Sequence, residues 1–208
     1  MKDSDSSGLL SAYKTRESLL LRLKDERNED AWREFHSIYG RLIFGYSLHF
    51  DISYAEAEDV VQEVCIKVFR QIIRFDYSPE RGRFRGWLKT MTRNTVIDYL
   101  RRKQTRLKAS REFRRDMEQK LKDEAAADDE IWRKEWEKAL YETAMERVRE
   151  RVGEETFRIF KRYVLDRDSA QDVANETSLD ANAIYAVKHR VLKYLRNEVE
   201  KIRNDEEV

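Results

Sequence analysis

Ionisable side chains at suitable spacings are what catalysis and metal binding require, and this chain offers few of them. Its three histidines, His36, His49 and His189, share no zinc-ligand spacing with each other or with the one cysteine, Cys65. The sequence has no phosphate-binding loop, no dinucleotide fingerprint and no nucleophile elbow. These observations predict no catalytic residue, no cofactor and no metal site, and they favour a protein that acts by binding.

An acidic group is the closest match to an acid–base pair. Glu58, Asp59 and Glu63 stand on one expected helix, in a stretch from residue 51 to 63 that has five acidic residues and no basic one. Two carboxylates on one helix could act as a general acid and a general base. We instead expect a solvated face or a face that binds a partner.

A segment rich in arginine and lysine is the first positive signal. Residues 81–111 hold eleven basic residues and a single acidic one, Asp98. Aromatic residues lie among these cations or just before them, at Phe75, Tyr77, Phe84, Trp87 and Tyr99. Such a mixture suits single-stranded nucleic acid, because bases stack on aromatic rings while cations neutralise phosphates. The alternative interpretations are a solvated basic helix face and a core position for Trp87 and Tyr99.

A second basic zone ends the chain, with six basic and two acidic residues between positions 182 and 203. Ile184, Val187, Val191 and Leu195 recur there at helical spacing and predict a helix with one apolar side. Polar residues on the opposite side and its flanks could read base edges or contact phosphates. These residues are Asn182, Tyr185, Lys188, His189, Arg190 and Lys193. An ordinary amphipathic helix with a basic exterior is the alternative.

Helical periodicity and a shortage of helix breakers predict an all-α fold. The chain has one proline and six glycines, and apolar residues recur at helical spacing over most of its length. Ser53 followed by Glu56 forms the sequence of a capping box and predicts the start of the clearest amphipathic helix. A short helix near 169–174, a polar break at 175–180 and a helix over 181–202 are typical of a helix-turn-helix.

The distribution of charge predicts two small helical domains joined by a flexible linker, the second of them a helix-turn-helix. We expect a disordered N-terminus over residues 1–14 and a first domain over 15–103. An acidic linker over 104–129 and a second domain over 130–208 would follow. No apolar run reaches 18 residues, and residues 1–8 lack the apolar segment of a signal peptide. The expected location is therefore the cytoplasm, without membrane insertion.

Three blocks of the sequence resemble one family, the extracytoplasmic-function (ECF) sigma factors of bacterial RNA polymerase. The stretch 57–64, AEDVVQEV, with Lys67, Phe69 and Arg70 after it, resembles the region 2.2 helix. The stretch 84–103, FRGWLKTMTRNTVIDYLRRK, resembles regions 2.3 and 2.4. Residues 169–195 resemble region 4, and the order and separation of the three blocks agree with the family.

The resemblance implies how such a protein would work. Region 2.2 would bind the β′ clamp coiled coil of the polymerase core, here through Asp59, Gln62, Glu63 and Ile66. Regions 2.3 and 2.4 would melt the −10 promoter element and capture it as a single strand. The residues implied for that work are Arg81, Arg83, Phe84, Arg85, Trp87, Lys89, Arg93 and Asn94. Region 4 would bind the −35 element through the face of the last helix described above, and the acidic linker would enter a basic channel of the polymerase.

Some positions depart from the family pattern, and other functions remain open. Arg167 and Asp168 stand where the family usually has a glycine, and the last helix reads IYAVKHRV where V-K-S-R-L is common. One alternative is a stand-alone helix-turn-helix regulator that binds duplex DNA without polymerase. Another is an all-helical scaffold for a protein partner, which would show no salt-sensitive DNA binding. The family also allows for an anti-sigma factor, which no residue here identifies.

Overall fold

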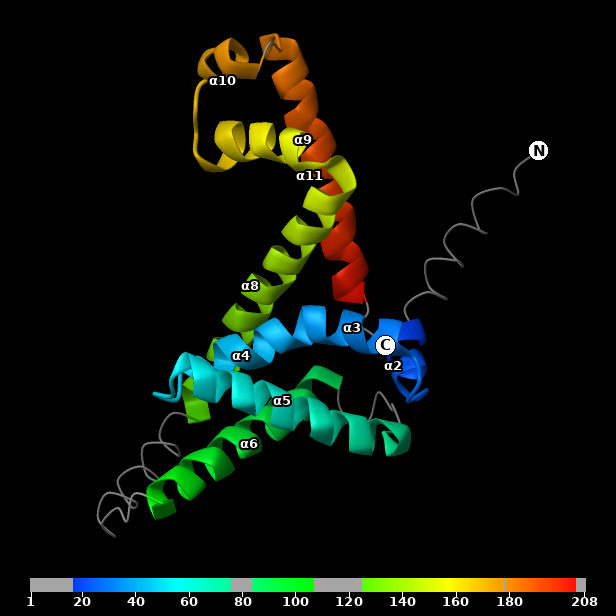
Figure 1. Cartoon of the computed structure of the whole chain (residues 1–208), viewed down its shortest axis with the longest axis vertical. Helices are drawn as coiled ribbons and strands as arrows, with labels where there is room; N and C mark the ends of the chain where they lie inside the picture. The colour runs from blue at the N-terminus through cyan, green and yellow to red at the C-terminus, as the bar shows by residue number, and fades with distance from the viewer. Residues whose placement is uncertain (1–16, 76–83, 107–124, 178, 205–208) are drawn as a thin grey trace, which may run out of the picture. The chain divides into compact units, whose positions relative to one another are not determined.

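The computed structural model describes residues 17–75, 84–106, 125–177 and 179–204 (Figure 1). These residues fold into helices joined by short turns and include no strand, which confirms the predicted all-α class. Contacts divide them into two compact units, one of the described residues up to Ala139 and one over Leu140–Asn204. Along the described ranges no helix is both long and apolar enough to cross a membrane.

The first unit begins with the helices that precede the amphipathic helix. α2 covers Glu17–Leu23 and α3 covers Glu29–Phe35, with the side chain of Asn28 accepting a hydrogen bond from the backbone N–H of Ala31 at its start. A π-helical turn, η1 (His36–Gly40), leads without a break into α4 (Arg41–Leu48), as the continuous ribbon in Figure 1 shows.

The remaining helices of the first unit carry the predicted site. α5 covers Tyr54–Gln71, a short 3-10 turn η2 follows over Ile72–Arg74, and α6 covers Phe84–Arg106. The capping box predicted from Ser53 and Glu56 is confirmed, because both of its reciprocal hydrogen bonds are present at the start of α5.

The core of the first unit lies where α4, α5 and α6 pack together. Val60, Val61, Val64 and Val68 of α5 point into it at helical spacing, as burial of one helix side requires, whereas Phe69 and Ile73 of the same predicted apolar pattern stay exposed. Fully buried side chains from the three helices include Leu42, Tyr46, Val60, Val64, Leu88 and Val96. This core holds the backbones of α5 and α6 in place and so determines which of their faces remain accessible.

Helix α8 covers Ala125–Val152, and its residues up to Ala139 belong to the first unit. The sequence predicts a second domain that starts at residue 130, whereas the compact units divide between Ala139 and Leu140. The reason is aromatic packing: Trp132 contacts the ring of Tyr46 and Trp136 stacks on Tyr39, both in the first unit. Of the expected linker, 104–106 lie in α6 and 125–129 in α8, and the rest lies outside the described residues, as does the expected disordered N-terminus.

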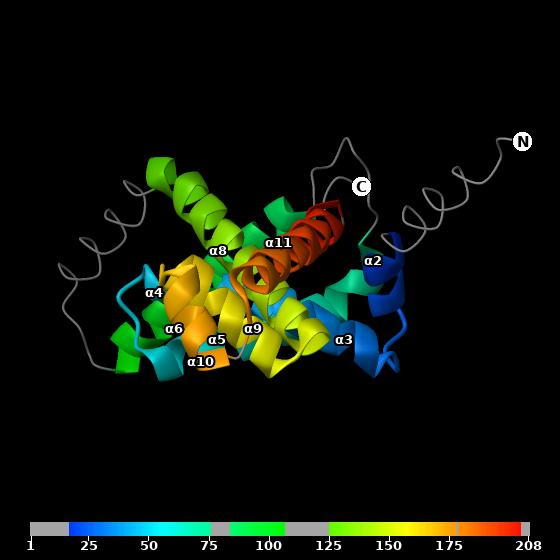
Figure 2. The same ribbon diagram turned by 90° about the horizontal axis from the view of Figure 1, so that it is seen from above.

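The second unit contains the end of α8, α9 (Glu154–Phe160), a π-helical turn η4 (Lys161–Leu165), α10 (Ala170–Thr177) and α11 (Ala181–Asn204). Gly153 joins α8 to α9 at φ 81, a left-handed conformation that glycine adopts at low cost. The short α10 and long α11 pack on each other and can be followed in Figure 2. The order of these two helices is the one that the sequence predicts.

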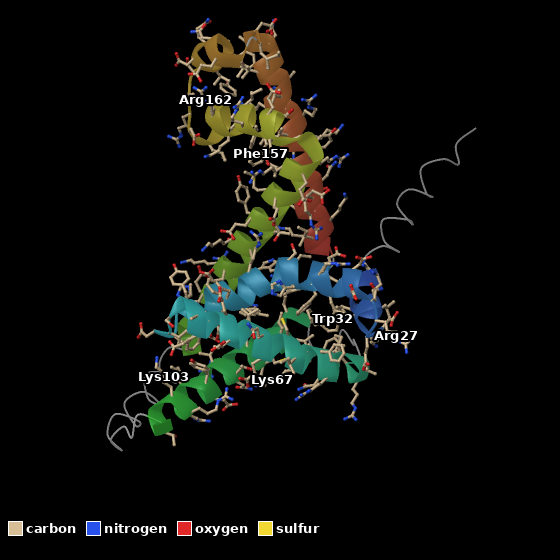
Figure 3. All side chains as sticks on the ribbon, in the orientation of Figure 1. Arg27, Trp32, Lys67, Lys103, Phe157 and Arg162 are labelled. Atoms are coloured by element: carbon tan, nitrogen blue, oxygen red, sulfur yellow. The ribbon has the colours of Figure 1, made fainter. Side chains whose placement is uncertain are left out.

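Arg162, at the start of η4, makes ion pairs with residues just before and within α10. The Nε of Arg162, a residue labelled in Figure 3, lies 2.7 Å from Oδ2 of Asp168, and the guanidinium also pairs with Glu176 in α10. Arg167, just before this pair, has φ 63 although it is not a glycine. The position where the family usually has a glycine therefore has the left-handed backbone that a glycine would suit.

Candidate polymerase and nucleic-acid interfaces

One side of α5 is left uncovered in the first unit. Asp59 and Gln62 are exposed on it, and Ile66 is 50% exposed, which is high for an isoleucine. The same side continues to Phe69 and Ile73, which are also among the exposed large apolar residues. Because these positions follow each other at steps of three and four, they form one continuous stripe of acidic, polar and apolar side chains.

Glu63 faces a different way from the other three predicted polymerase-binding residues. Its carboxylate lies 3.0 Å from Nζ of Lys67 and 2.6 Å from Nη2 of Arg102 in α6. Burial raises the pKa of Glu63, but hydrogen bonds from Arg102 and Lys67 outweigh that effect and leave the pKa below its ordinary value. Asp59, Gln62 and Ile66 thus share the open face, whereas Glu63 joins α5 to α6.

A second ion pair joins the same two helices two turns earlier on α5. Nζ of Lys103 lies 2.6 Å from Oε1 of Glu56, the capping-box residue. The hydrogen bonds from Lys103 and from the backbone N–H of Ser53 lower the pKa of Glu56 to about 2. Figure 3 labels Lys67, which pairs with Glu63 within α5, and Lys103, which pairs with Glu56 from α6. Basic residues at the end of α6 therefore neutralise part of the acidic surface of α5.

The residues predicted to contact the −10 element fall into separate groups. Arg81 and Arg83 lie outside the described residues. Phe84 is only 5% exposed and packs edge-on against Tyr39 and Phe75. Its ring belongs to the core, so this geometry gives Phe84 a supporting role rather than a surface for a base.

Trp87 and Asn94 lie on the open side of α6. Trp87 is half-buried, with its ring 4.8 Å from that of Phe75 and 5.5 Å from that of Phe84, and Asn94 is exposed two turns further along. The sequence left open whether Trp87 is a core or a surface residue, and the structure shows that part of its ring is buried and part is exposed. This aromatic ring backed by other rings and followed by an amide is suited to stacking and hydrogen bonding with an unpaired base.

Three predicted cations, Arg85, Lys89 and Arg93, lie on the side of α6 that faces α8. Nζ of Lys89 is 2.8 Å from Oδ2 of Asp128 and also pairs with Asp129. Burial lowers the pKa of Lys89, but these two carboxylates outweigh it and raise the pKa overall. Nε of Arg93 is 3.7 Å from Asp128, and the guanidinium of Arg85 lies over the ring of Trp136 at 4.9 Å.

The start of α8 is the part of this site that the sequence did not predict. Trp132 and Trp136 are 6% and 3% exposed, and the hydroxyl of Tyr46 donates a hydrogen bond to Asp128. Burial is the main reason that the pKa of Tyr46 is raised, with the bond to Asp128 adding to it. The available signal was two acids followed by tryptophans four residues apart, but the same pattern also describes an ordinary amphipathic helix.

The polar face of α11 is open in the second unit. Four of the predicted residues are exposed on it at steps of three and four, as the apolar pattern on the other side of the helix predicts: Asn182, Tyr185, His189 and Lys193.

The other two predicted residues flank this stripe. Lys188 turns toward Tyr163, with its Nζ 5.7 Å from the centre of the tyrosine ring. Arg190, on the opposite flank, lines a groove with Thr156 of α9 and Thr177 of α10. Four of the six predicted residues therefore share one stripe, and two flank it.

Metal-binding and thiol chemistry find little support in the described ranges. No group of three or more histidine, cysteine, aspartate or glutamate side chains there could hold a metal ion. Cys65 is a free thiol whose partial burial raises its pKa to about 11. A thiol with that pKa stays protonated at neutral pH and is a poor nucleophile.

Comparison with known proteins bears on the first unit. Residues 35–106, from the end of α3 through α6, match the family model of Sigma-70 region 2. None of the curated proteins compared with the chain matches it. The family match supports a sigma-70 family factor, and with it a part in transcription initiation that involves RNA polymerase core and promoter DNA.

Proposed function

We propose that this chain is an ECF-type sigma factor that binds RNA polymerase core through α5 and directs it to promoters. The observation that carries the proposal is the open face of Asp59, Gln62 and Ile66, on a helix inside the region matched to Sigma-70 region 2. A mixed acidic and apolar stripe suits a protein interface, because apolar burial supplies affinity and the carboxylate supplies orientation.

The proposed role of α6 is to capture the melted −10 strand. Trp87 offers part of its ring for stacking, and Asn94 offers an amide that can donate to and accept from one base edge. The cations at Arg85, Lys89 and Arg93 would neutralise phosphates. Phe84 would act indirectly by supporting the ring of Trp87.

The proposed role of the second unit is to bind the −35 element as duplex DNA, with α10 and α11 acting as a helix-turn-helix. Support comes from the stripe of Asn182, Tyr185, His189 and Lys193 on α11, which is long enough to lie in a major groove. Such a protein would work in the cytoplasm, where polymerase and promoters are. An anti-sigma factor, if one exists, would have to cover one of these faces.

Binding to polymerase core is the test of this proposal. The purified chain is mixed with bacterial core enzyme and the mixture is separated by size exclusion. We expect co-elution at one-to-one stoichiometry, and we expect Asp59→Arg to abolish it, because the new cation would face the partner where a carboxylate fits. Glu150→Arg in the second unit makes the same charge change at another exposed helix position and should co-elute like the unaltered chain.

If the Asp59→Arg variant co-elutes with core enzyme as well as the unaltered chain does, the exposed face of α5 is not part of the interface. If the unaltered, folded chain fails to bind core at all, the second candidate gains: a helix-turn-helix regulator that binds duplex DNA alone. The exposed basic face of α11 favours that candidate independently of α5. It predicts salt-sensitive binding to duplex DNA without polymerase.

A further inference from the structure

The first turn of α8 occupies the cations that the proposed function assigns to nucleic acid. Asp128 contacts both Lys89 and Arg93, and Asp129 contacts Lys89. The Lys89 side chain is only 16% exposed as a result. A carboxylate and a phosphate oxygen make the same kind of charge-assisted hydrogen bond to an ammonium or guanidinium group. The aspartate carboxylates of α8 and the phosphates of a bound strand would therefore compete for Lys89 and Arg93.

A second set of contacts holds α8 in place independently of these acids. Trp132 meets the ring of Tyr46 edge-on at 4.9 Å, and Trp136 stacks on Tyr39 at 5.7 Å with an interplanar angle of 20°. Buried aromatic rings of this size make a large hydrophobic contribution to packing. The carboxylate of Glu135 adds a contact to Nε2 of His49 at 2.8 Å.

The carboxylate of Glu135 lies close to Gly45 of α4. A Cβ at this position would collide with the carboxylate of Glu135, so a side chain there would displace the contact between Glu135 and His49. Glycine at this point of α4 lets the carboxylate lie against the helix backbone.

The acids and the tryptophans lie at different distances from the beginning of α8. Asp128 and Asp129 are in its first two turns, close to the helix end, where backbone groups lack intrahelical partners; the Asp129 side chain is 91% exposed and the Asp128 side chain 12%. Trp132 and Trp136 lie one and two turns further in. Opening of these two turns would free Lys89 and Arg93, while the tryptophans would keep the rest of α8 attached.

We propose that Asp128 and Asp129 are a built-in competitor for nucleic-acid phosphate at Lys89 and Arg93, so that the free protein binds single strands weakly until these turns open. The inference rests on the proposed function, since it assigns those two cations to DNA. It adds a regulatory contact inside the first unit.

The test is a binding measurement on the full chain with a fluorescent oligothymidylate of about 20 nucleotides, a length that spans more than one typical single-strand site. The variant Asp128→Asn/Asp129→Asn keeps side chains of similar size, and an asparagine can still accept the hydrogen bond from Tyr46. We expect its affinity to rise roughly 3- to 10-fold at low salt, because freed cations reach phosphate. Thermal unfolding of each variant verifies that it is folded.

Two controls separate local competition from net charge. Glu130→Gln/Glu137→Gln removes the same charge from the same helix, at residues that pair with Arg133, and should leave affinity within about 2-fold. In a Lys89→Gln/Arg93→Gln background, the aspartate changes should have no further effect.

An equal gain in the glutamate control, or a full gain without Lys89 and Arg93, would overturn the inference. Equal binding by the unaltered chain and the aspartate variant would also overturn it while leaving strand capture intact. Absence of binding by every folded variant would instead count against strand capture itself, and the inference would fall with it.

Discussion

Three carboxylates of α5 have different roles because the helix turns them in different directions. Glu56 pairs with Lys103 and Glu63 pairs with Arg102, both across to α6, whereas Asp59 lies on the exposed side. Glu56 and Glu63 are seven positions, or about two helical turns, apart and therefore share one side of α5, whereas Asp59 is rotated away from that side. The charge of a residue is visible in the sequence, and its partner is decided by this rotation.

The pH dependence of stability should reveal the Glu56 pair. The pKa of Glu56 is lowered to about 2 from an ordinary 4.5, so its contribution is present above pH 4.5 and is lost as the pH falls towards 2. Glu56→Gln retains a capping-box residue but removes the charge. We expect the variant to be less stable by about 1 kcal/mol at neutral pH.

Urea unfolding at neutral pH and near pH 2 measures this prediction. The difference in unfolding free energy between the two proteins should shrink at the lower pH, because near pH 2 Glu56 is protonated in the unfolded chain and about half protonated in the folded one. A constant difference at both pH values would mean that the pair with Lys103 contributes nothing through charge.

At the scale of elements, α8 shows that packing decides which compact unit a helix belongs to. Periodicity predicts the helix itself, and Trp132 and Trp136 fall on its apolar side. Periodicity does not show which hydrophobic core the apolar side packs into. The expected linker before this helix led to the prediction that the helix belongs to the second domain. The contacts with Tyr39 and Tyr46 place this part of α8 in the first unit.

Substitution of the docked aromatic residues tests this assignment. Trp136→Ala removes a side chain that is 3% exposed and stacked on Tyr39, and it should destabilise the first unit by about 3 kcal/mol. Tyr141→Ala on the same helix removes a ring that is 48% exposed and should cost less than about 1 kcal/mol. Similar small effects of both changes, measured by denaturant unfolding, would show that α8 is not part of the first core.

At the scale of the whole molecule, the tryptophans are unevenly distributed. All four, Trp32, Trp87, Trp132 and Trp136, precede residue 140 and belong to the first unit. Each unit has its own buried residues, with Ile159, Phe160, Val173, Ile184 and Val191 in the second. Tryptophan fluorescence therefore reports on one unit, whereas the helical circular dichroism signal reports on both.

Unfolding in denaturant should show this division. We expect the fluorescence and circular dichroism transitions to differ, because two separate cores need not unfold together. Phe160→Ala removes a buried ring of the second unit and should shift the circular dichroism curve while leaving the fluorescence midpoint nearly unchanged. Coincident curves that shift together in the variant would show a single cooperative unit.

The sequence by itself determined the helical class, the capping box at Ser53 and the polar faces of α5 and α11, because these depend on the spacing of residues along one helix. It also carried the resemblance in the region that matches Sigma-70 region 2. Only the tertiary structure decided that Glu63 pairs across to α6, that Phe84 is core, and that Lys89 and Arg93 meet the acids of α8. Those outcomes depend on which helix side meets which neighbour, and contacts between residues 40 positions apart are not encoded in local periodicity.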